Sequence, residues 1–146
     1  RVRLFGIEPK VALISHSNFG SHEDEGAKKM QKALEIILKR EPTLQVDGEM
    51  HIDTALDPAV RERLLPDSRL TGCANLFVFP NLDTANTAYN IVRSMTDGVC
   101  LGPILMGLAK SAHILTPAST VRRVVNMTAV AAVDAQIRKI RETQPA

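Results

Sequence analysis

Short apolar runs alternate with longer amphipathic stretches along the chain, and polar turns join them. The apolar runs have the length and the bounding residues of buried strands: 10–15, 43–48 and 74–80. Segments with helical periodicity follow them: 22–40, 57–66 with Pro58 at its first position, and 83–95. Strands that alternate with helices predict an α/β fold with a mostly parallel sheet, whose ligands bind at the carboxyl ends of the strands.

The expected helices begin at residues that are typical N-caps. Ser21 is the expected cap of helix 22–40, and Asp24 three residues later completes a pattern similar to a capping box. Asp83 or Thr84 is the expected cap of helix 83–95.

Both ends of the sequence carry further signals. Residues 1–10 are typical of the last turn of a helix that Gly6 closes in the left-handed conformation, which suggests a chain cut from something longer. The tetrapeptide HILT (113–116) predicts a last short strand, and the final helix is expected from Thr116 or Ser119 to Glu142. The apolar stripe of this helix is formed by Val121, Val124, Val125, Thr128, Ala132 and Ile137. Because its middle part also consists of small residues, we expect other segments to pack against more than one side of the helix.

Composition narrows the classes of function. The 146 residues are 45% hydrophobic and 23% charged, as is typical of one soluble globular unit. The 18 Lys and Arg against 16 Asp and Glu give a net charge of +2 that is spread along the chain, and aromatic residues make up 3%. We therefore expect no nucleic-acid partner. No apolar run reaches the ~18 residues that span a bilayer, so we expect no membrane association and a cytoplasmic location.

Neither cysteines nor glycine motifs indicate a cofactor. Cys73 and Cys100 fit no metal-ligand spacing, and we expect both to be buried, reduced thiols. No strand is followed by G-x-G-x-x-G, and G-x-x-x-x-G-K-[ST] does not occur, so the sequence predicts neither of the common nucleotide-binding loops.

The turn SHSNFGS (15–21) is the first candidate site. Its hydroxyls, Asn18 and the backbone amides near Gly20 could hold an anion at a helix N-terminus. Against this, Glu23, Asp24 and Glu25 already place negative charge in that helical turn. The alternative is a capped turn at a domain or subunit contact, in which His16 is either a ligand contact or a hydrogen-bonded neighbour.

Three other segments offer polar groups. Asp47, Glu49, His51 and Asp53 alternate, so on a strand they would share one face as a metal site or as a turn lining a cleft. Asn81 and Asn86 follow the strand 74–80, where a parallel sheet presents its ligand groups. Lys110 ends the glycine-rich stretch, and Arg122 and Arg123 lie in the first turns of the last helix. These three cations could bind an anion, and the alternative is that they are solvated surface residues.

Five segments in a fixed order resemble the carboxyl-terminal part of the phosphate acetyltransferase (phosphotransacetylase) family. They are KVALISHSNFGS, VDGEMHIDTAL, NLFVFPNLDTANTAYNIVR, GPILMGLAKSAHILTPAS and TVRRVVNMTAVAAVDAQ. The resemblance covers nearly the whole chain. In detail the chain is most similar to the variant fused behind the catalytic part of bacterial multidomain NADP-dependent malic enzymes.

The resemblance implies a three-layer α/β/α fold with a mostly parallel sheet, as in isocitrate and isopropylmalate dehydrogenases, and a ligand cleft between two domains. Residues 1–112 would be the second, CoA-cleft domain. Residues 113–146 would be a strand and helix that return to the first domain, the rest of which is absent. It also implies acetyl-CoA or acetyl phosphate as ligand and a homo-oligomer, dimeric or higher. NADP and a divalent metal would belong only to the absent catalytic part.

The residues associated with catalysis are replaced in this chain. Active family members usually read NDLSRGCSxxDIV before the last helix, and their Ser, Arg, Cys and Asp fall here on Thr116, Pro117, Ser119 and Arg123. Proline cannot contact a phosphate as a guanidinium does, and arginine cannot accept a proton as a carboxylate does. The resemblance therefore implies a domain without catalytic or metal-binding residues.

The resemblance thus predicts a domain that binds acetyl-CoA as an allosteric inhibitor and supports oligomerisation. The alternatives are an active phosphate acetyltransferase and a structural assembly module. The expected ligand-binding residues are Ser17, Asn18, Gly20, Ser21, Asn81, Asn86, Lys110, Thr116, Arg122 and Arg123.

Overall fold

The computed structural model describes residues 2–117 and 119–143. The chain forms two compact units, Arg1–Val92 and Arg93–Ala146. The predicted division at residues 112 and 113 concerns the larger two-domain protein, and it stays a prediction.

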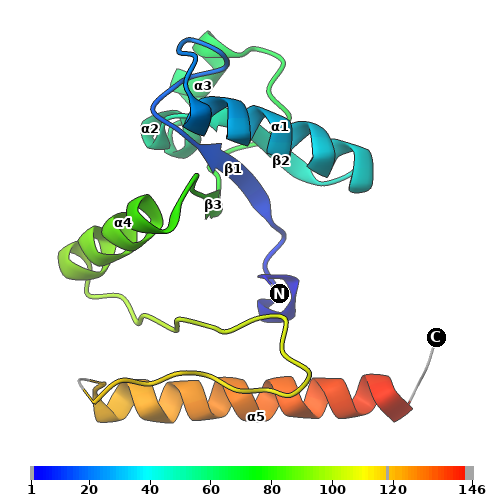
Figure 1. Cartoon of the computed structure of the whole chain (residues 1–146), viewed down its shortest axis with the longest axis vertical. Helices are drawn as coiled ribbons and strands as arrows, with labels where there is room; N and C mark the ends of the chain where they lie inside the picture. The colour runs from blue at the N-terminus through cyan, green and yellow to red at the C-terminus, as the bar shows by residue number, and fades with distance from the viewer. Residues whose placement is uncertain (1, 118, 144–146) are drawn as a thin grey trace. The chain divides into compact units, whose positions relative to one another are not determined.

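A three-stranded parallel sheet forms the centre of the first unit (Figure 1). Its strands are β1 (Lys10–Ile14), β2 (Gln45–Met50) and β3 (Leu76–Val78), in the order β2-β1-β3. The helices that follow them are α1 (Glu25–Arg40), α2 (Ile52–Leu56), α3 (Pro58–Leu64) and α4 (Leu82–Met95). The α/β class, the parallel sheet and Pro58 at the start of α3 are confirmed, whereas α2 was not predicted.

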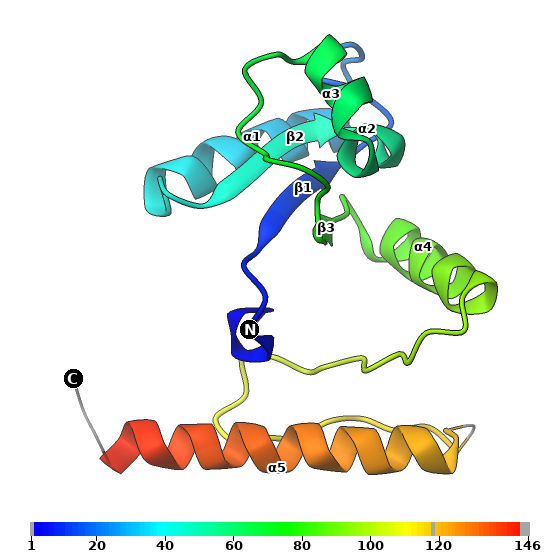
Figure 2. The ribbon, with the colours of Figure 1, turned by 180° about the vertical axis from the view of Figure 1, so that it is seen from behind.

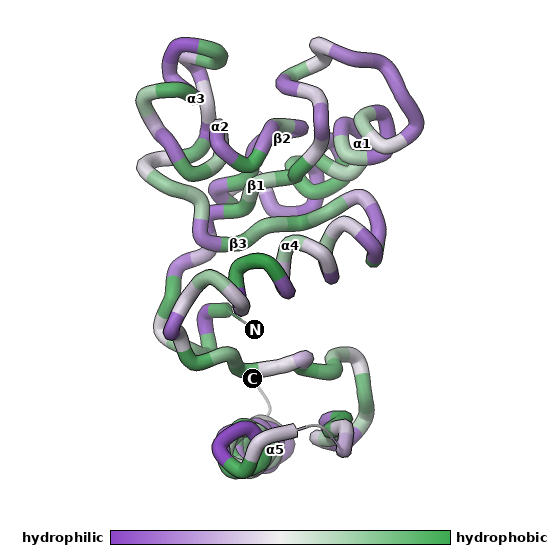
Figure 3. Tube along the Cα trace, turned by 90° about the vertical axis from the view of Figure 1, so that its left-hand side faces the viewer, coloured by the Kyte–Doolittle hydropathy of each residue, from purple (hydrophilic) through white to green (hydrophobic). Residues whose placement is uncertain are grey.

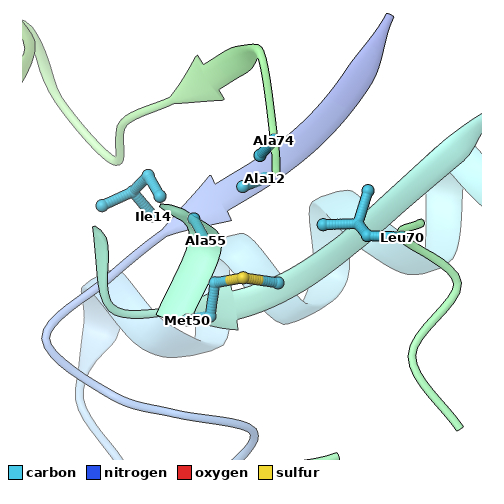
Figure 4. Close-up of a cluster of buried hydrophobic side chains, with 6 residues drawn as sticks. All are labelled: Ala12, Ile14, Met50, Ala55, Leu70 and Ala74. Atoms are coloured by element: carbon cyan, nitrogen blue, oxygen red, sulfur yellow. The ribbon is translucent and has the colours of Figure 1, made fainter. Parts of the chain in front are cut away.

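Both faces of the sheet are covered because the side chains of β1 alternate between two apolar clusters. Val11 and Leu13 pack with Met30 of α1 on one face. Ala12 and Ile14 pack on the other face with the cluster that Figure 4 shows, made by Met50, Ala55, Leu70 and Ala74. The four buried residues of β1 therefore join two helical layers to one strand, which is the arrangement of an α/β/α fold.

The register of β1 and β2 changes near their carboxyl ends. Leu13 pairs with Gly48 but Ile14 pairs with Met50, so one residue of β2 is skipped. Gly48 has φ 144°, and a Cβ there would lie 2.7 Å from the carbonyl oxygen of Leu13. Only glycine fits this position, and the skipped residue, Glu49, is turned toward the 15–21 turn.

A buried arginine ties α2, α3 and the following loop together. Arg61 is 2% exposed, and its guanidinium donates to carbonyl oxygens of four residues: Thr54, Ala55, Leu70 and Gly72. Asp57 caps α3 by accepting from the backbone N–H of Ala59 at 2.9 Å. Buried N–H groups that find acceptors in this way avoid the cost of desolvation.

The first residues and the cysteines test two further predictions. Residues Val2–Phe5 form a 3-10 turn closed by Gly6 at φ 72°, which confirms the predicted left-handed cap. Next to it, the side-chain hydrogen bond from Arg3 lowers the pKa of Glu8.

Both cysteines are free, but Cys73 is exposed and Cys100 is half-buried, so the prediction of buried thiols is wrong. Each lies on an irregular segment outside the two clusters.

The second unit consists of helix α5 (Val121–Thr143) and an irregular segment that runs along it (Figure 2). Arg123 Nη2 donates to the carbonyl oxygen of Gly102 at 2.7 Å, and Arg138 Nη1 donates to that of Leu108 at 2.8 Å. The predicted strand at 113–116 is wrong. This segment is extended, but in the described part of the chain no second strand pairs with it, and a strand requires such a partner.

Helix α5 also begins later than predicted. The backbone N–H of Arg123 donates to Thr120 Oγ1 at 3.2 Å, so Thr120 caps the helix. Most of the predicted apolar stripe is exposed, with Val121 at 81% and Val125 at 61%. Figure 3, which views α5 end on, shows hydrophobic and hydrophilic residues around its axis. Within the described residues, no helix has the length and apolar character needed to cross a bilayer.

Candidate functional site

The three parallel strands of the first unit end at one edge, and a cleft of about 850 Å³ lies there. Its lining comes from the residues that directly follow the strands and from the helix starts beyond them: Ile14, Ser15, His16, Asp24, Gly26, His51, Ile52, Asp53, Phe79, Pro80, Asn81, Thr84 and Ala88. The volume falls in the range of small-molecule sites, about 300–1,000 Å³. A cleft thus lies at the edge where the sequence predicted a ligand site, and ligand binding there stays a prediction.

Hydrogen bonds to Glu49 hold the turn after β1 (residues 15–21) in place. This carboxylate is 1% exposed, and its Oε1 accepts from the Ser17 hydroxyl at 2.8 Å and from the backbone N–H of Gly20 at 2.7 Å. The backbone N–H of Phe19 donates to the carbonyl oxygen of Glu49 at 2.8 Å. Three donors of one turn thus converge on one residue, which fixes Ser15 and His16 at the cleft wall.

The exit of β2 is joined to the same turn. The backbone N–H of His51 donates to Asn18 Oδ1 at 2.8 Å, and His51 Nε2 lies 2.7 Å from the carbonyl oxygen of His16. His51 Nδ1 lies 4.0 Å from Asp53 Oδ1. Because both bonds cross from β2 to the turn, the two walls of the cleft form one hydrogen-bonded frame.

The exit of β3 supplies the third wall. Asn81 Oδ1 accepts from the backbone N–H of Thr84 at 2.9 Å, so Asn81 is the cap of α4. The predictions of Asp83 and Thr84 as the cap are wrong, because α4 begins at Leu82 and both lie inside its first turn. Lys29 Nζ donates to the carbonyl oxygen of Pro80 at 2.6 Å, which connects α1 to this wall.

Carboxylates set the fixed charge of the cleft. Asp24 caps α1 by accepting from the backbone N–H of Ala27 at 2.6 Å, and Asp24 Oδ2 lies 3.5 Å from His16 Nδ1. The predicted cap at Ser21 is therefore wrong, since the helix starts at Glu25 and Ser21 lies in the preceding turn. The residues described around the cleft include Asp24 and Asp53 but no Lys or Arg.

The alternating residues from 47 to 53 do not share one face. The register of β2 changes after Gly48, Asp53 lies in α2, and Asp47 accepts hydrogen bonds from Ser68 and Arg69, which do not line the cleft. Among the described residues, no group of three or more His, Cys, Asp or Glu is placed to hold a metal ion.

The expected ligand residues fall in two places. In the first unit, Asn81 lines the cleft, Ser17 is fully buried beneath the turn, and Asn86 is exposed on α4. Ser21 Oγ accepts from the backbone N–H of Asn18 at 2.9 Å. Gly20, like Ser17, is bonded to Glu49, so the turn uses these groups internally, and their binding role stays a prediction.

The remaining expected residues belong to the second unit. Thr116 and Ser119 form a turn before α5, in which the backbone N–H of Ser119 donates to the Thr116 carbonyl oxygen at 2.9 Å. Lys110, Pro117 and Arg122 are exposed, and Arg123 is half-buried against Gly102. Their role in ligand binding also stays a prediction.

Sequence reasoning did not include His51 and Asp53 in the ligand set. The signal was present, because both directly follow β2 and the carboxyl edge is where parallel strands present ligand groups. The sequence predicted them as part of a metal site or of a turn that lines a cleft, and both do line the cleft. The predicted strand ended at Gly48, whereas β2 continues to Met50.

A family model described as phosphate acetyl/butaryl transferase matches residues 1–132. The chain belongs to this family. A phosphotransacetylase structure from Streptococcus pyogenes superimposes on it with a TM-score of 0.83 and 35% identity, over 92% of this chain and 41% of that one. The resemblance seen in the sequence, and the fold that it implied, are confirmed.

In longer relatives, a segment similar to this chain forms only part of the protein. The NADP-dependent malic enzyme of Escherichia coli is 53% identical over 140 residues, which are 95% of this chain and 18% of that enzyme. The phosphate acetyltransferase of Paracoccus denitrificans is 45% identical over 130 residues, which are 89% of this chain and 41% of that protein. The chain is thus a phosphotransacetylase-like domain of a kind found in both classes of enzyme, and it spans less than half the length of either relative.

Proposed function

We propose that this chain is the regulatory, phosphotransacetylase-like domain of a malic enzyme and that it binds acetyl-CoA as an allosteric inhibitor. The observation that carries the proposal is the sequence before the last helix, where the resemblance implies that Pro117 stands in place of a catalytic arginine and Arg123 in place of a catalytic aspartate. Support also comes from the 53% identity to a malic enzyme against 45% to a phosphate acetyltransferase.

The environment of Arg123 explains why catalysis would be lost. Its Nη2 donates to the carbonyl oxygen of Gly102 at 2.7 Å, so the side chain packs on the irregular segment as a structural cation. A carboxylate at this position could accept a proton from the thiol of CoA, but a guanidinium stays protonated at every physiological pH. Binding can persist without transfer, because the strands and the hydrogen-bonded frame at their carboxyl ends are made by residues of the first unit.

Inhibition would follow from different affinities of acetyl-CoA for two states of the oligomer. A ligand shifts a conformational equilibrium only by its differential affinity. In the full-length protein, NADP and a divalent cation would serve the malate-oxidising part, and the protein would act in the cytoplasm. The assembly role, as a second candidate function, is favoured by the exposed apolar residues of α5, with Val121 81% exposed.

The test is to titrate acetyl-CoA into the full-length protein while malate oxidation and acetyl transfer from acetyl phosphate to CoA are followed in parallel. We expect inhibition of malate oxidation and no acetyl transfer. Acetyl transfer at enzymatic rates would instead establish an active phosphate acetyltransferase. Oligomers of unchanged size and activity at saturating acetyl-CoA would leave only the assembly role.

A further inference from the structure

We propose that Asp134 and Arg138 of α5 are positioning residues for Lys110. They fix the backbone directly before this lysine and so hold its ammonium group where it meets an anionic group of acetyl-CoA. The proposal rests on the proposed function, because Lys110 is one of the expected ligand residues. It adds two residues that act on the ligand only through Lys110.

The irregular segment before α5 is anchored to the helix at two places. Residues 102–116, which we call the strap, run along α5 (Figure 2). The carbonyl oxygen of Gly102 accepts from Arg123 Nη2 at 2.7 Å, near the start of the helix. The carbonyl oxygen of Leu108 accepts from Arg138 Nη1 at 2.8 Å, near its end. Two arginines of one helix thus fix both ends of the first half of the strap.

This first half has little slack between its two anchors. Arg123 and Arg138 are 15 residues apart, which corresponds to about 22 Å along an α-helix. Gly102 and Leu108 are six residues apart, and a fully extended chain of that length spans at most about 22 Å. The backbone up to Leu108 is therefore stretched along α5 and cannot shift while both anchors hold.

Lys110 lies where the strap turns back. Gly107 has φ 84°, the left-handed conformation that glycine adopts without strain, and it directly precedes the second anchor. The backbone N–H of Leu105 donates to His113 Nδ1 at 3.3 Å, which joins the two halves of the strap. Lys110 is thus at the start of the returning half.

A buried carboxylate fixes the direction of the Arg138 side chain. Asp134 is 7% exposed, and its Oδ2 accepts from Arg138 Nε at 3.0 Å. Arg138 Nη1 also donates to the carbonyl oxygen of Ala109 at 3.2 Å, which belongs to the peptide bond with Lys110. The planar fork of arginine serves the carboxylate and the carbonyl oxygens at once, whereas the ammonium of lysine is a single point. The ion pair therefore clamps the backbone that leads into Lys110.

The side chain of Lys110 is free to bind a ligand. It is exposed and donates to no acceptor among the described residues. Its ammonium group can pair with a phosphate, and acetyl-CoA carries several. A fixed backbone strengthens such a contact, because less conformational freedom is lost when the ligand binds.

A double-mutant cycle in the full-length protein tests the assignment. Isothermal titration calorimetry would measure acetyl-CoA binding to Lys110→Ala, Arg138→Lys, Asp134→Asn and the double variant of the first two. Arg138→Lys keeps the positive charge beside Asp134 but lacks the fork. Lys139→Arg is the matched control, because it exchanges the same two cations at the neighbouring exposed position. Circular dichroism would show whether each variant keeps its helices.

We expect Lys110→Ala to weaken acetyl-CoA binding about tenfold, the scale of one lost charge-assisted contact. Arg138→Lys and Asp134→Asn should each weaken it about three- to tenfold, since a positioning residue contributes no more than the group that it positions. The double variant should bind as weakly as Lys110→Ala alone. Lys139→Arg should bind like the wild type.

Several results would overturn the assignment while the proposed function stands. Wild-type affinity in both Arg138→Lys and Asp134→Asn would show that the clamp does not affect the ligand. Additive losses in the double variant would show that Arg138 acts independently of Lys110, and unchanged affinity in Lys110→Ala would show that there is no contact to position. Loss of helical structure in both clamp variants would make the ion pair a support of the fold alone. If the wild type itself binds no acetyl-CoA, the proposed function fails and this assignment fails with it.

Discussion

Glu49 does not line the cleft, but its hydrogen bonds fix the turn at residues 15–21 that forms one wall of it. Its Oε1 accepts from Ser17 at 2.8 Å and from the backbone N–H of Gly20 at 2.7 Å, and the side chain is 1% exposed. Spacing alone suggested that Glu49 was one of four residues on a shared face. The register change at Leu13 and Ile14 depends on contacts between segments that are distant in the sequence, so no local pattern could have predicted where this carboxylate points.

Substitution of Glu49 tests its role in holding the turn. In Glu49→Ala the Ser17 hydroxyl and the Gly20 amide both lose their acceptor, and each unsatisfied buried donor costs about 1–3 kcal/mol. We expect Glu49→Ala to lower the free energy of unfolding by roughly 2–5 kcal/mol. Glu49→Gln keeps a side-chain oxygen as acceptor and should cost about half as much or less.

Native-state hydrogen exchange of the full-length protein, read at the amides of β1 and of residues 17–21, would measure both variants. Glu41→Ala is a suitable control, because its side chain is exposed at the end of α1. Equal exchange rates in Glu49→Ala and the control would contradict the positioning role.

At the scale of elements, the sequence predicted the strands and long helices of the first unit, and it placed their boundaries less well. The three strand cores and α1 were evident because buried apolar runs and a 3.6-residue period are local properties. The caps of α1 and α4 were misplaced by two or three residues, since several polar residues lie near the start of each helix and only the final geometry selects one. Asp24 was selected over Ser21, which bonds to Asn18 instead.

The cap of α4 gives a prediction that separates two expected ligand residues. Asn81 accepts from the backbone N–H of Thr84 at 2.9 Å, whereas Asn86 makes only a 3.4 Å contact with Asn90 among the described residues. Asn81→Ala should destabilise the first turn of α4 by about 1 kcal/mol, and Asn86→Ala should have almost no effect.

Amide exchange of residues 82–86 would report this difference directly. Equal protection in the two variants would show that Asn81 does not cap the helix. Asn81→Ser restores a capping oxygen and should recover most of the lost protection.

At the scale of the whole molecule, the second unit is where the sequence was least informative. The segment before α5 resembled a strand because its residues are apolar and β-prone, but β-structure requires a neighbour to pair with. The apolar stripe of α5 was expected to be covered, yet Val121 and Val125 are 81% and 61% exposed in this chain. A hydropathy pattern indicates that a helix face is buried in the folded protein, but it does not indicate which segment packs against that face.

Large exposed apolar surfaces mark contacts with other protein segments. Because the chain spans 18% of the malic enzyme and 41% of the acetyltransferase that it matches, we expect the exposed face of α5 to be covered in the full-length protein. Val125→Asp places a charge on that face, and burial of an unpaired charge is strongly unfavourable. It should dissociate the oligomer or lower the midpoint of thermal unfolding by several degrees, an effect of about 2–4 kcal/mol.

Gln136→Asp is the matched control, because it adds the same charge at an exposed polar position of the same helix. Sedimentation velocity would measure the oligomer, and differential scanning calorimetry the unfolding. If Val125→Asp behaves like Gln136→Asp in both measurements, this face stays in solvent. The assembly role would then lose its support.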